Sequence, residues 1–297
     1  MNIHLLLQFI VNGIIVGLLY GVVAMSFVLI YKASRVVNFA QGEFLLIGAW
    51  TCWWFLNQYQ VPFVIALLAV IAVMAILGML IQVVVLRPLI GEPIISVIMV
   101  TIGLSVFFQA MMKWIFGPDP KSFPEVFPVK TLQLAGMTFE TVYALSALMA
   151  LVMIGAFAYL FKATKIGLAM RATAFNQQVA SSLGVSVKRM FAVSWAISAV
   201  VSGLAGVIVG MVNGVSSGLS SFGLKVFPAV ILGGFDSIFG AVAGGLIIGI
   251  LENLAEFVDG QYLHLGNMYA IAPFYVLVII LMIKPYGLFG TRDIERV

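Results

Sequence analysis

Residues 62–86, PFVIALLAVIAVMAILGMLIQVVVL, decide the fold class of this chain. The run contains one polar side chain, Gln82, and no charged one. A helix needs roughly 20 apolar residues to cross a bilayer core of about 30 Å, and this run exceeds that length. Runs of similar length and composition recur from residue 7 to residue 283. The sequence therefore predicts a chain that crosses a membrane several times.

The overall composition supports the same conclusion. Of the 297 residues, 63% are hydrophobic and 9% are charged, and the mean hydropathy is +1.17. Soluble domains carry about 25% charged residues, so this chain has too few charges to cover a surface that faces water. A soluble enzyme, a nucleic-acid binder and a disordered protein are excluded. The single cysteine, Cys52, allows no intrachain disulfide and is expected to be a small core residue.

We predict an all-α, polytopic transmembrane helical bundle of about 8–9 membrane segments that forms a single domain over residues 1–297. No lysine or arginine precedes Lys32, and the first apolar run is too long for a signal peptide, so this run is expected to remain as a helix. Ser221–Gly233 is short for a full crossing and is expected to be broken or re-entrant. The predicted segments are Leu7–Tyr31, Asn38–Leu56, Pro62–Leu86, Ile94–Phe116, Thr141–Phe161, Phe191–Val212, Ser221–Gly233, Ile238–Val258 and Met268–Ile283.

The distribution of basic residues predicts the orientation. Loops rich in lysine and arginine stay in the cytoplasm. With the N-terminus outside, eleven of the 15 Lys and Arg residues fall inside, Arg292 and Arg296 among them. The C-terminus then lies in the cytoplasm if Ser221–Gly233 counts as a crossing or a re-entrant piece. The pI of 9.2 is thus explained by topology, and no nucleic-acid partner is expected.

The longest segment expected outside is Gly117–Glu140. Its four prolines disfavour a helix. The segment either covers the outer mouth of the bundle, contacts a soluble partner or serves as a solvated connector. The prolines are Pro118, Pro120, Pro124 and Pro128.

Glycines recur at four-residue spacing within the predicted segments. Small residues at this spacing let helix backbones approach closely. We expect tight internal packing at these positions; a subunit interface or a flexing gate is the alternative. The sets are Gly13/Gly17/Gly21, Gly206/Gly210/Gly214, Gly240/Gly244 and Gly245/Gly249.

The glycine-rich stretch 233–245 differs from a nucleotide-binding loop. The chain contains no G-x-x-x-x-G-K-[ST] motif, so any ATP used with this protein must bind to another chain. The glycine pair Gly233–Gly234 is expected to break the backbone, and Asp236 and Ser237 are expected to cap the next helix.

Polar residues occur at two places in otherwise apolar segments. Asn38 and Gln41 have the spacing of a reciprocal helix cap, and Glu43 follows in the first turns, where a helix dipole favours a carboxylate. The alternative is a role at the inner end of a transport pathway.

The second place is the segment Ile238–Val258, which contains Glu252, Asn253 and Glu256, with Asp259 continuing the same helix face. Charges at membrane depth are costly unless they face protein or water, which makes these residues candidates for a pathway. The alternative is an interfacial or helix-packing role.

Residues 162–190 form the most polar segment expected in the cytoplasm. Its centre, Arg171–Ala180, is compatible with a short helix, which Gly184 is expected to end. Such a helix either docks in a groove of a soluble protein or lies exposed at the surface. Catalytic patterns are missing: the two histidines, His4 and His264, belong to no metal-binding or nucleophile motif, so an enzyme is not expected.

Several motifs together resemble the permease subunits of branched-chain amino-acid ABC importers of the LivH type. The resemblance covers nearly the whole chain in order. It departs from the family at Gln41, where the family often has histidine, and at Asn176, where an acidic residue is usual. The motifs are GLLYGVVA at 17–24, NFAQGE at 38–43, GLAMRA at 167–172, LGV at 183–185, LGG at 232–234 and PYGLFG at 285–290.

The resemblance implies a multi-pass protein of the bacterial inner membrane that works with other chains. These are a second LivM-like permease, two cytoplasmic ATPase subunits that bind ATP and Mg, and a periplasmic substrate-binding protein. No cofactor is implied in this chain. The coupling segment would include Arg171, Ala172, Thr173, Asn176, Ala180 and Gly184, and the substrate pathway would include Glu43, Glu252, Asn253 and Glu256.

The resemblance implies alternating access driven by ATP binding in the partner subunits, with the substrate passing along the interface of the two permeases. It leaves the substrate open among branched-chain or other hydrophobic amino acids, urea, amides and aromatic acids. A self-contained secondary transporter or channel is a different possibility, although no internal repeat is visible. An intramembrane enzyme is disfavoured by the missing catalytic residues.

Overall fold

The computed structural model describes residues 3–127, 130–134 and 137–291. Pro128, Arg292 and Arg296, which entered the sequence analysis, lie outside the described residues. The helices are α1 (Ile3–Ser34), α2 (Gln41–Gln58), α3 (Phe63–Leu80), η1 (Ile81–Leu86), η2 (Arg87–Leu89), α4 (Ile94–Phe116), α5 (Thr141–Ala163), α6 (Lys165–Phe175), α7 (Gln177–Ser182), α8 (Val187–Asn213), α9 (Gly218–Lys225), α10 (Phe227–Gly233), α11 (Ile238–Val258), η3 (Asp259–Leu263) and α12 (Met268–Ile283), and the strands are β1 (Thr131–Leu134) and β2 (Met137–Glu140).

The predicted polytopic helical bundle is confirmed. Within the described residues, six helices are long and apolar enough to cross a membrane, and the stretches Gly218–Gly233 and Met268–Ile283 add shorter apolar helices. Helix α2 is less hydrophobic than these six helices because polar residues occupy both its ends. Most of its first twelve residues are nevertheless buried. A helix surrounded by protein does not need an apolar surface, so α2 can carry polar side chains at membrane depth.

Contacts group the chain into two compact units, which are described separately. Unit 1 comprises residues 1–28, 127–150 and 225–297, and unit 2 comprises residues 29–126 and 151–224. The expectation of a single domain over residues 1–297 stays a prediction.

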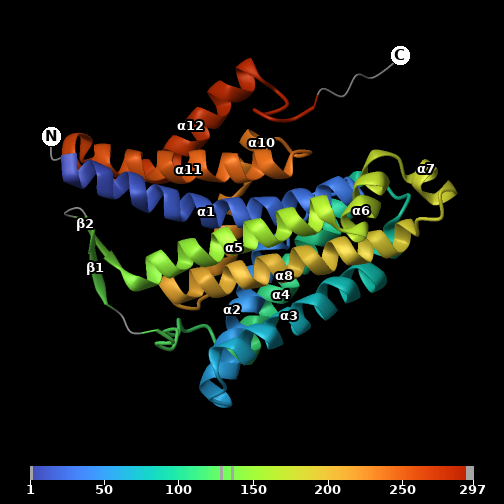
Figure 1. Ribbon diagram of the computed structural model, residues 1–297, viewed down its shortest axis with the longest axis horizontal. Helices are drawn as coiled ribbons and strands as arrows, with labels where there is room; N and C mark the ends of the chain where they lie inside the picture. The colour runs from blue at the N-terminus through green and yellow to red at the C-terminus, as the bar shows by residue number, and fades with distance from the viewer. Residues whose placement is uncertain (1–2, 128–129, 135–136, 292–297) are drawn as a thin grey trace. The chain divides into compact units, whose positions relative to one another are not determined.

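In unit 1, α1 and α11 run side by side (Figure 1). A Cβ on Gly17 would collide with the backbone of Leu246, and one on Gly249 would collide with Gly17 itself. The expected tight glycine packing is therefore present between these helices, as small residues at four-residue spacing allow. Helix α10 packs on α11 in the same way, because a Cβ on Gly244 would meet the carbonyl of Ala229.

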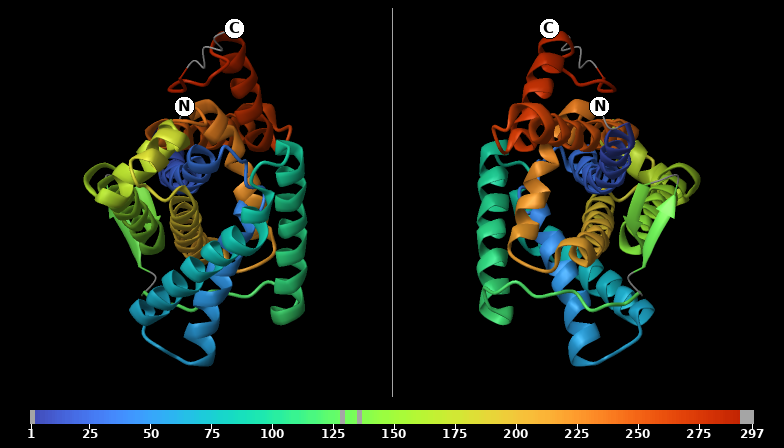
Figure 2. Two further views of the ribbon diagram at one scale, coloured as in Figure 1. Left: turned by 90° about the vertical axis from the view of Figure 1, so that its right-hand side faces the viewer. Right: turned by 90° about the vertical axis from the view of Figure 1, so that its left-hand side faces the viewer.

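In unit 2, α2, α3 and α8 pack on one another (Figure 2). The backbones of α2 and α8 meet at Gly48 and Gly203, and Gly206 lies directly on the backbone at Leu45. Beside these contacts, Trp195 of α8 packs edge-on against Phe44 of α2, with ring centroids 6.3 Å apart. Glycine therefore brings the two backbones together, and large aromatic side chains fill the space next to the contact.

Two segments each form two helices instead of one, and for the first of them, Ser221–Gly233, a broken segment was expected. The short stretch after α8 forms two helices, α9 and α10, with Pro228 in the first turn of α10, where proline is tolerated because that amide has no helical partner. Residues Arg171–Ala180 belong to two helices as well, because Asn176 is extended (φ −154°, ψ 112°) and separates α6 from α7.

Outside the helices, the proline-containing segment Gly117–Glu140 includes a short hairpin. Strands β1 and β2 pair antiparallel, with Thr131 opposite Glu140. The sequence analysis expected no helix there but did not foresee the strands. At the start of α11, Ser237 caps the helix by accepting a hydrogen bond from the amide of Gly240 at 3.0 Å, as expected, whereas Asp236 accepts from Thr291 instead.

Candidate functional site

Glu43 lies in the first turn of α2, inside unit 2, and is 2% exposed. Ser105 of α4 donates a hydrogen bond to Oε1 at 2.9 Å, and Ser220 of α9 donates to Oε2 at 2.8 Å. Both carboxylate oxygens therefore have a donor, which offsets part of the cost of burying this group. Glu43 ties three elements of unit 2 together.

Next to Glu43, Gln41 points toward α8. Its Nε2 donates hydrogen bonds to Ser198 at 3.1 Å and to Ser202 at 2.5 Å, and its Oε1 accepts from Nδ2 of Asn38 at 3.0 Å. Oδ1 of Asn38 accepts from the amide of Ala40 at 3.0 Å. The predicted reciprocal cap is wrong, because both side chains belong to a buried polar network between α2 and α8.

The other pathway candidates lie in unit 1. Glu252 of α11 is half-buried, and its Oε2 accepts a hydrogen bond from the hydroxyl of Tyr20 on α1 at 2.7 Å. Asn253 donates to the carbonyl of Gly249 on its own helix at 3.0 Å, and Glu256 is exposed. Of these residues, Glu252 is the carboxylate that contacts a second helix through a hydrogen bond.

Asp259 follows α11 in a helical conformation (φ −64°, ψ −47°), so the expected spacing along the helix is kept, but its side chain serves the turn beyond the helix. Its side chain is buried and accepts hydrogen bonds from the backbone amides of Leu265, at 2.8 Å, and Met268, at 3.5 Å. It therefore holds the turn between η3 and α12. Tyr20, in contrast, was missed by the sequence analysis, although a phenol in the apolar segment Leu7–Tyr31 needs a partner when buried and was the available signal.

Helices α6 and α7 form the segment that the sequence analysis assigned to coupling. Thr164 caps α6 by accepting from the amide of Gly167 at 3.0 Å, and Asn176 caps α7 by accepting from Val179 at 3.0 Å. Aspartate and asparagine are equally good at such a position, so asparagine can replace an acidic residue there without losing the cap.

Gly184 ends α7 as predicted. With φ at +84°, its amide bonds to the carbonyl of Ser181, and the amide of Val185 bonds to that of Ala180, each at 3.0 Å. This is the Schellman arrangement, which requires a left-handed residue and therefore favours glycine.

The predicted coupling residues differ in exposure. The side chains of Thr173 and Ala180 are buried, and the guanidinium of Arg171 lies 5.5 Å above the ring of Phe161. Ala172 is half-buried, whereas Asn176 and Gly184 are exposed. The buried residues, Thr173 and Ala180, pack against the rest of the unit. They are therefore not part of the surface that a partner could contact.

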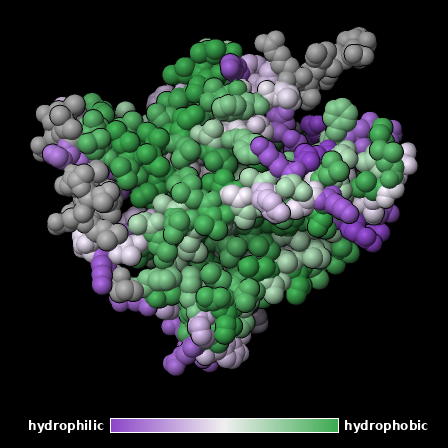
Figure 3. Space-filling model, in the orientation of Figure 1, coloured by the Kyte–Doolittle hydropathy of each residue, from purple (hydrophilic) through white to green (hydrophobic). Residues whose placement is uncertain are grey.

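The outer surface of this segment carries apolar side chains that the sequence analysis missed. Phe175, at the end of α6, is 94% exposed, and Leu183, after α7, is 77% exposed. At the right in Figure 3, where Figure 1 has α6 and α7, hydrophilic and hydrophobic side chains lie side by side on the surface. These two exposed side chains are candidates for a contact with another protein. The available signal was that Phe175 directly precedes the polar stretch 176–178 and that Leu183 directly precedes Gly184.

Residues 9–283 match the family described as branched-chain amino acid transport system / permease component. The chain belongs to this family. The match covers both units, so the carboxylates of α2 and α11 and the α6–α7 segment all lie within it.

Relatives of nearly full length support the assignment. The branched-chain amino acid permease protein BraD of Pseudomonas aeruginosa is 29% identical over 100% of this chain and 99% of its own length. LivH of Escherichia coli is 27% identical over 98% of this chain and 97% of its own. A probable LivH of Methanocaldococcus jannaschii is 27% identical over 94% and 91%. No solved structure matches this chain significantly.

Membership in the family confirms the resemblance seen in the sequence. The chain is a multi-pass membrane protein and a permease subunit of an ABC importer, which is a transport component and not an enzyme. Neither the family nor the fold assigns a role to a single residue, so the pathway and coupling residues stay predictions.

Proposed function

We propose that this chain forms, with a second LivM-like permease, the path by which branched-chain or other hydrophobic amino acids enter a bacterial cell. The observation that carries the proposal is the match over residues 9–283 to permease components of branched-chain amino acid transport systems. BraD and LivH, both named as permeases for branched-chain amino acids, agree with this substrate class. Under the proposal the protein lies in the inner membrane, with its N-terminus outside and its C-terminus in the cytoplasm, as the basic residues predict.

Energy comes from other chains in this proposal. Two cytoplasmic ATPase subunits bind ATP and Mg, and a periplasmic protein delivers the substrate, since this sequence has no P-loop. ATP binding draws the coupling segments together and opens the permease pair outward toward the loaded binding protein. Each step requires that ATP or substrate bind one conformation more tightly than the other, because equal affinity shifts no equilibrium.

Contact with an ATPase subunit is assigned to the α6–α7 segment. Phe175 and Leu183 are the exposed apolar side chains that would enter a groove of that subunit. Replacing either with aspartate should leave the permease in the membrane and abolish its co-purification with the ATPase, because a charge cannot enter an apolar groove without a partner. Leu265→Asp, at a 72% exposed leucine before α12, is the matched control and should co-purify normally.

The function is tested by uptake in proteoliposomes that contain the permease pair and the ATPase subunits. With ATP inside and the binding protein outside, L-leucine should accumulate, and omission of this chain should abolish accumulation. Accumulation without ATP or ATPase subunits would overturn the proposal in favour of a secondary transporter or channel. If excess urea, an amide or an aromatic acid abolishes leucine uptake and is itself accumulated faster, the substrate class belongs to that compound.

A further inference from the structure

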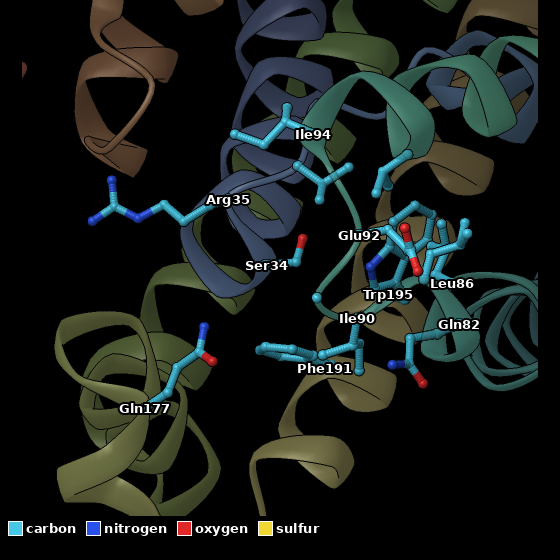
Figure 4. Close-up of a pocket in the computed structure, with 14 residues that line it drawn as sticks. Ser34, Arg35, Gln82, Leu86, Ile90, Glu92, Ile94, Gln177, Phe191 and Trp195 are labelled. Atoms are coloured by element: carbon cyan, nitrogen blue, oxygen red, sulfur yellow. The ribbon is translucent and has the colours of Figure 1, made fainter.

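A cavity of about 240 Å³ lies within unit 2, beside the ends of several of its helices. Its wall combines the end of α1, the connection from α3 to α4, the start of α7 and the first turns of α8 (Figure 4). The apolar span Phe63–Leu89 ends at this cavity, and the span Ile94–Phe116 begins there. Because lipid headgroups lie where membrane spans end, the cavity is at headgroup depth.

The wall of the cavity continues into the surface that faces the membrane. Ile90 and Ile94 line the cavity and are 54% and 63% exposed. Val84 of η1, next to these residues in the same connection, is 61% exposed. Exposed apolar side chains at the end of a membrane span contact lipid chains. A lipid whose chains lie along these residues can therefore place its headgroup at the cavity.

The groups that line the cavity suit a cation. The carboxylate of Glu92 lines it together with the rings of Phe191 and Trp195. Figure 4 shows Glu92 and Gln82 on the same side as Trp195, whereas the side chain of Arg35 points away from the cavity. A carboxylate attracts a cation by its charge, and the faces of aromatic rings attract it as well. The interior of the cavity therefore favours a positively charged group.

Gln82 indicates which kind of cation fits. It is 2% exposed and lines the cavity, and its Oε1 has no hydrogen-bond partner among the described residues. A buried carbonyl oxygen without a donor is costly, so its place in a cavity wall points to a ligand that donates a hydrogen bond. A primary ammonium has three N–H donors, whereas a quaternary ammonium has none. Gln82 therefore favours a primary ammonium.

We propose that this cavity holds the headgroup of a phosphatidylethanolamine lipid. The primary ammonium donates to Glu92 and Gln82, the phosphate stays at the mouth, and the acyl chains lie along the exposed side chains of η1 and α4. Pockets for drug-sized ligands usually measure about 300–1,000 Å³, so this smaller cavity suits a headgroup and not a whole lipid. Phosphatidylserine fits less well, because its additional carboxylate would lie near Glu92.

The inference concerns a lipid that the permease holds, and it goes beyond the proposed transport of amino acids. Gln177 of α7 lines the same cavity as Glu92 and Gln82. A headgroup in the cavity therefore lies between the membrane-facing connection of α3 and α4 and the segment assigned to coupling.

The experiment titrates the delipidated full-length chain in detergent with three lipids that share the same acyl chains. These are phosphatidylethanolamine, its N,N-dimethyl derivative and phosphatidylcholine, in which the number of N–H donors falls from three to one to none while the positive charge is kept. Native mass spectrometry gives the dissociation constant of the first bound lipid. Phosphatidylcholine should bind about tenfold more weakly than phosphatidylethanolamine, with the dimethyl lipid between them. Equal constants for all three lipids would overturn the proposal.

Two variants separate the roles of the two polar groups. Gln82→Leu should weaken binding of phosphatidylethanolamine about tenfold and leave phosphatidylcholine unchanged, because the quaternary headgroup donates no hydrogen bond. Glu92→Gln should weaken both lipids about tenfold, because the carboxylate attracts either cation. Gln58→Leu and Glu125→Gln, at exposed residues that do not line the cavity, are the matched controls and should bind as the parent does. Unchanged discrimination between the two lipids in Gln82→Leu would overturn the assignment.

Thermal unfolding of Gln82→Leu without added lipid distinguishes a ligand role from a structural one. Replacing an unpartnered buried amide with an apolar side chain of similar size should maintain or raise the unfolding temperature. A clearly lower unfolding temperature would show that the amide holds the fold, and it would overturn the role of Gln82 in lipid binding.

Two further compounds identify the source of the ammonium. Glycerophosphoethanolamine has the same headgroup without acyl chains and should not displace the lipid, because it lacks the apolar contacts. Displacement at concentrations comparable to those of the lipid would overturn the proposal in favour of a soluble amine. Phosphatidylglycerol has the acyl chains without an ammonium and should bind more weakly than phosphatidylethanolamine. Equal or tighter binding of phosphatidylglycerol would overturn the cation site.

Discussion

The α1–α11 contact of unit 1 and the α2–α8 contact of unit 2 both depend on glycine, yet they differ in polarity. Gly17 and Gly249 bring the first pair of backbones together, and Gly48 and Gly203 bring the second pair together. The described hydrogen bond across the first contact joins Tyr20 and Glu252. The second contact encloses a network of Gln41, serines and Asn38, beside the buried Glu43.

The difference separates two kinds of carboxylate. Glu43 has a serine donor on each oxygen and is almost completely buried, so it holds helices in place. Glu252 is half-buried and has a tyrosine donor on one oxygen, which leaves part of its side chain accessible. Because a partly accessible carboxylate can meet water or a solute, we expect Glu252 rather than Glu43 to serve the pathway.

The largest effect should come from filling the glycine contacts. Gly48→Leu and Gly17→Leu should each abolish a monodisperse protein, because a side chain would collide with the opposite backbone. The cost exceeds the roughly 1–3 kcal/mol usual for overpacking, since backbone cannot move aside as a side chain can. Size-exclusion profiles and membrane levels measure the outcome. Gly155→Leu, where a Cβ would meet nothing within 4 Å, is the control and should behave normally.

The next effect compares the two carboxylates directly. Glu43→Ala should lower the free energy of unfolding by about 2–4 kcal/mol, because Ser105 and Ser220 lose their acceptor and a cavity remains. Glu252→Ala should lower it by about 1–2 kcal/mol, because one hydrogen bond to a half-buried group is lost. Thermal unfolding in nanodiscs gives the order, with Glu140→Ala as an exposed control. A larger loss for Glu252→Ala would reverse the assignment.

These comparisons show why the sequence predicts some features and misses others. Helix positions follow from local hydropathy, and α4, α11 and α12 begin and end where the sequence predicts. The glycine spacing likewise predicted the close packing of α1 on α11 and of α2 on α8, since it depends on residues within one helix, but it was wrong for Gly214, which ends α8 with φ at +76°. Hydrogen-bond partners on distant elements could not be predicted in this way. The residues around Gln41 do not indicate that it bonds to serines of α8, and those around Tyr20 do not indicate Glu252.

The α6–α7 segment shows the same limit of prediction from local sequence. The sequence indicated the polar segment. Because all of Arg171–Ala180 is compatible with a helix, the sequence did not show that Asn176 ends α6 and begins α7. That break exposes Phe175 and buries Thr173, so the side chains available to a partner differ from those the motif emphasised.

Rates of leucine uptake should distinguish the role of Glu252 from that of Glu256. Glu252→Gln and Tyr20→Phe should each lower leucine uptake about tenfold, equivalent to about 1.4 kcal/mol, while the protein still assembles. Glu256→Gln should have a smaller effect, because Glu256 is exposed and has no described helix partner. Uptake rates at equal protein level give the ratio, and Tyr159→Phe, at a 70% exposed tyrosine, is the matched control for Tyr20→Phe. An equal loss in the Glu256 and Glu252 variants would show that charge alone matters.

The smallest effect tests the polar network of the α2–α8 contact, using two serines one turn apart on α8. Ser198 accepts a hydrogen bond from Gln41, whereas Ser194 Oγ is buried with no hydrogen-bond partner in the described part of the chain. Ser198→Ala should lower the free energy of unfolding by about 0.5–1.5 kcal/mol, and Ser194→Ala should leave it unchanged or raise it, because an unsatisfied hydroxyl is removed. Thermal unfolding of both variants measures the difference. If Ser194→Ala is the more destabilising, its hydroxyl has a partner such as water, and the polar network extends one turn further along α8 than the hydrogen bonds described here.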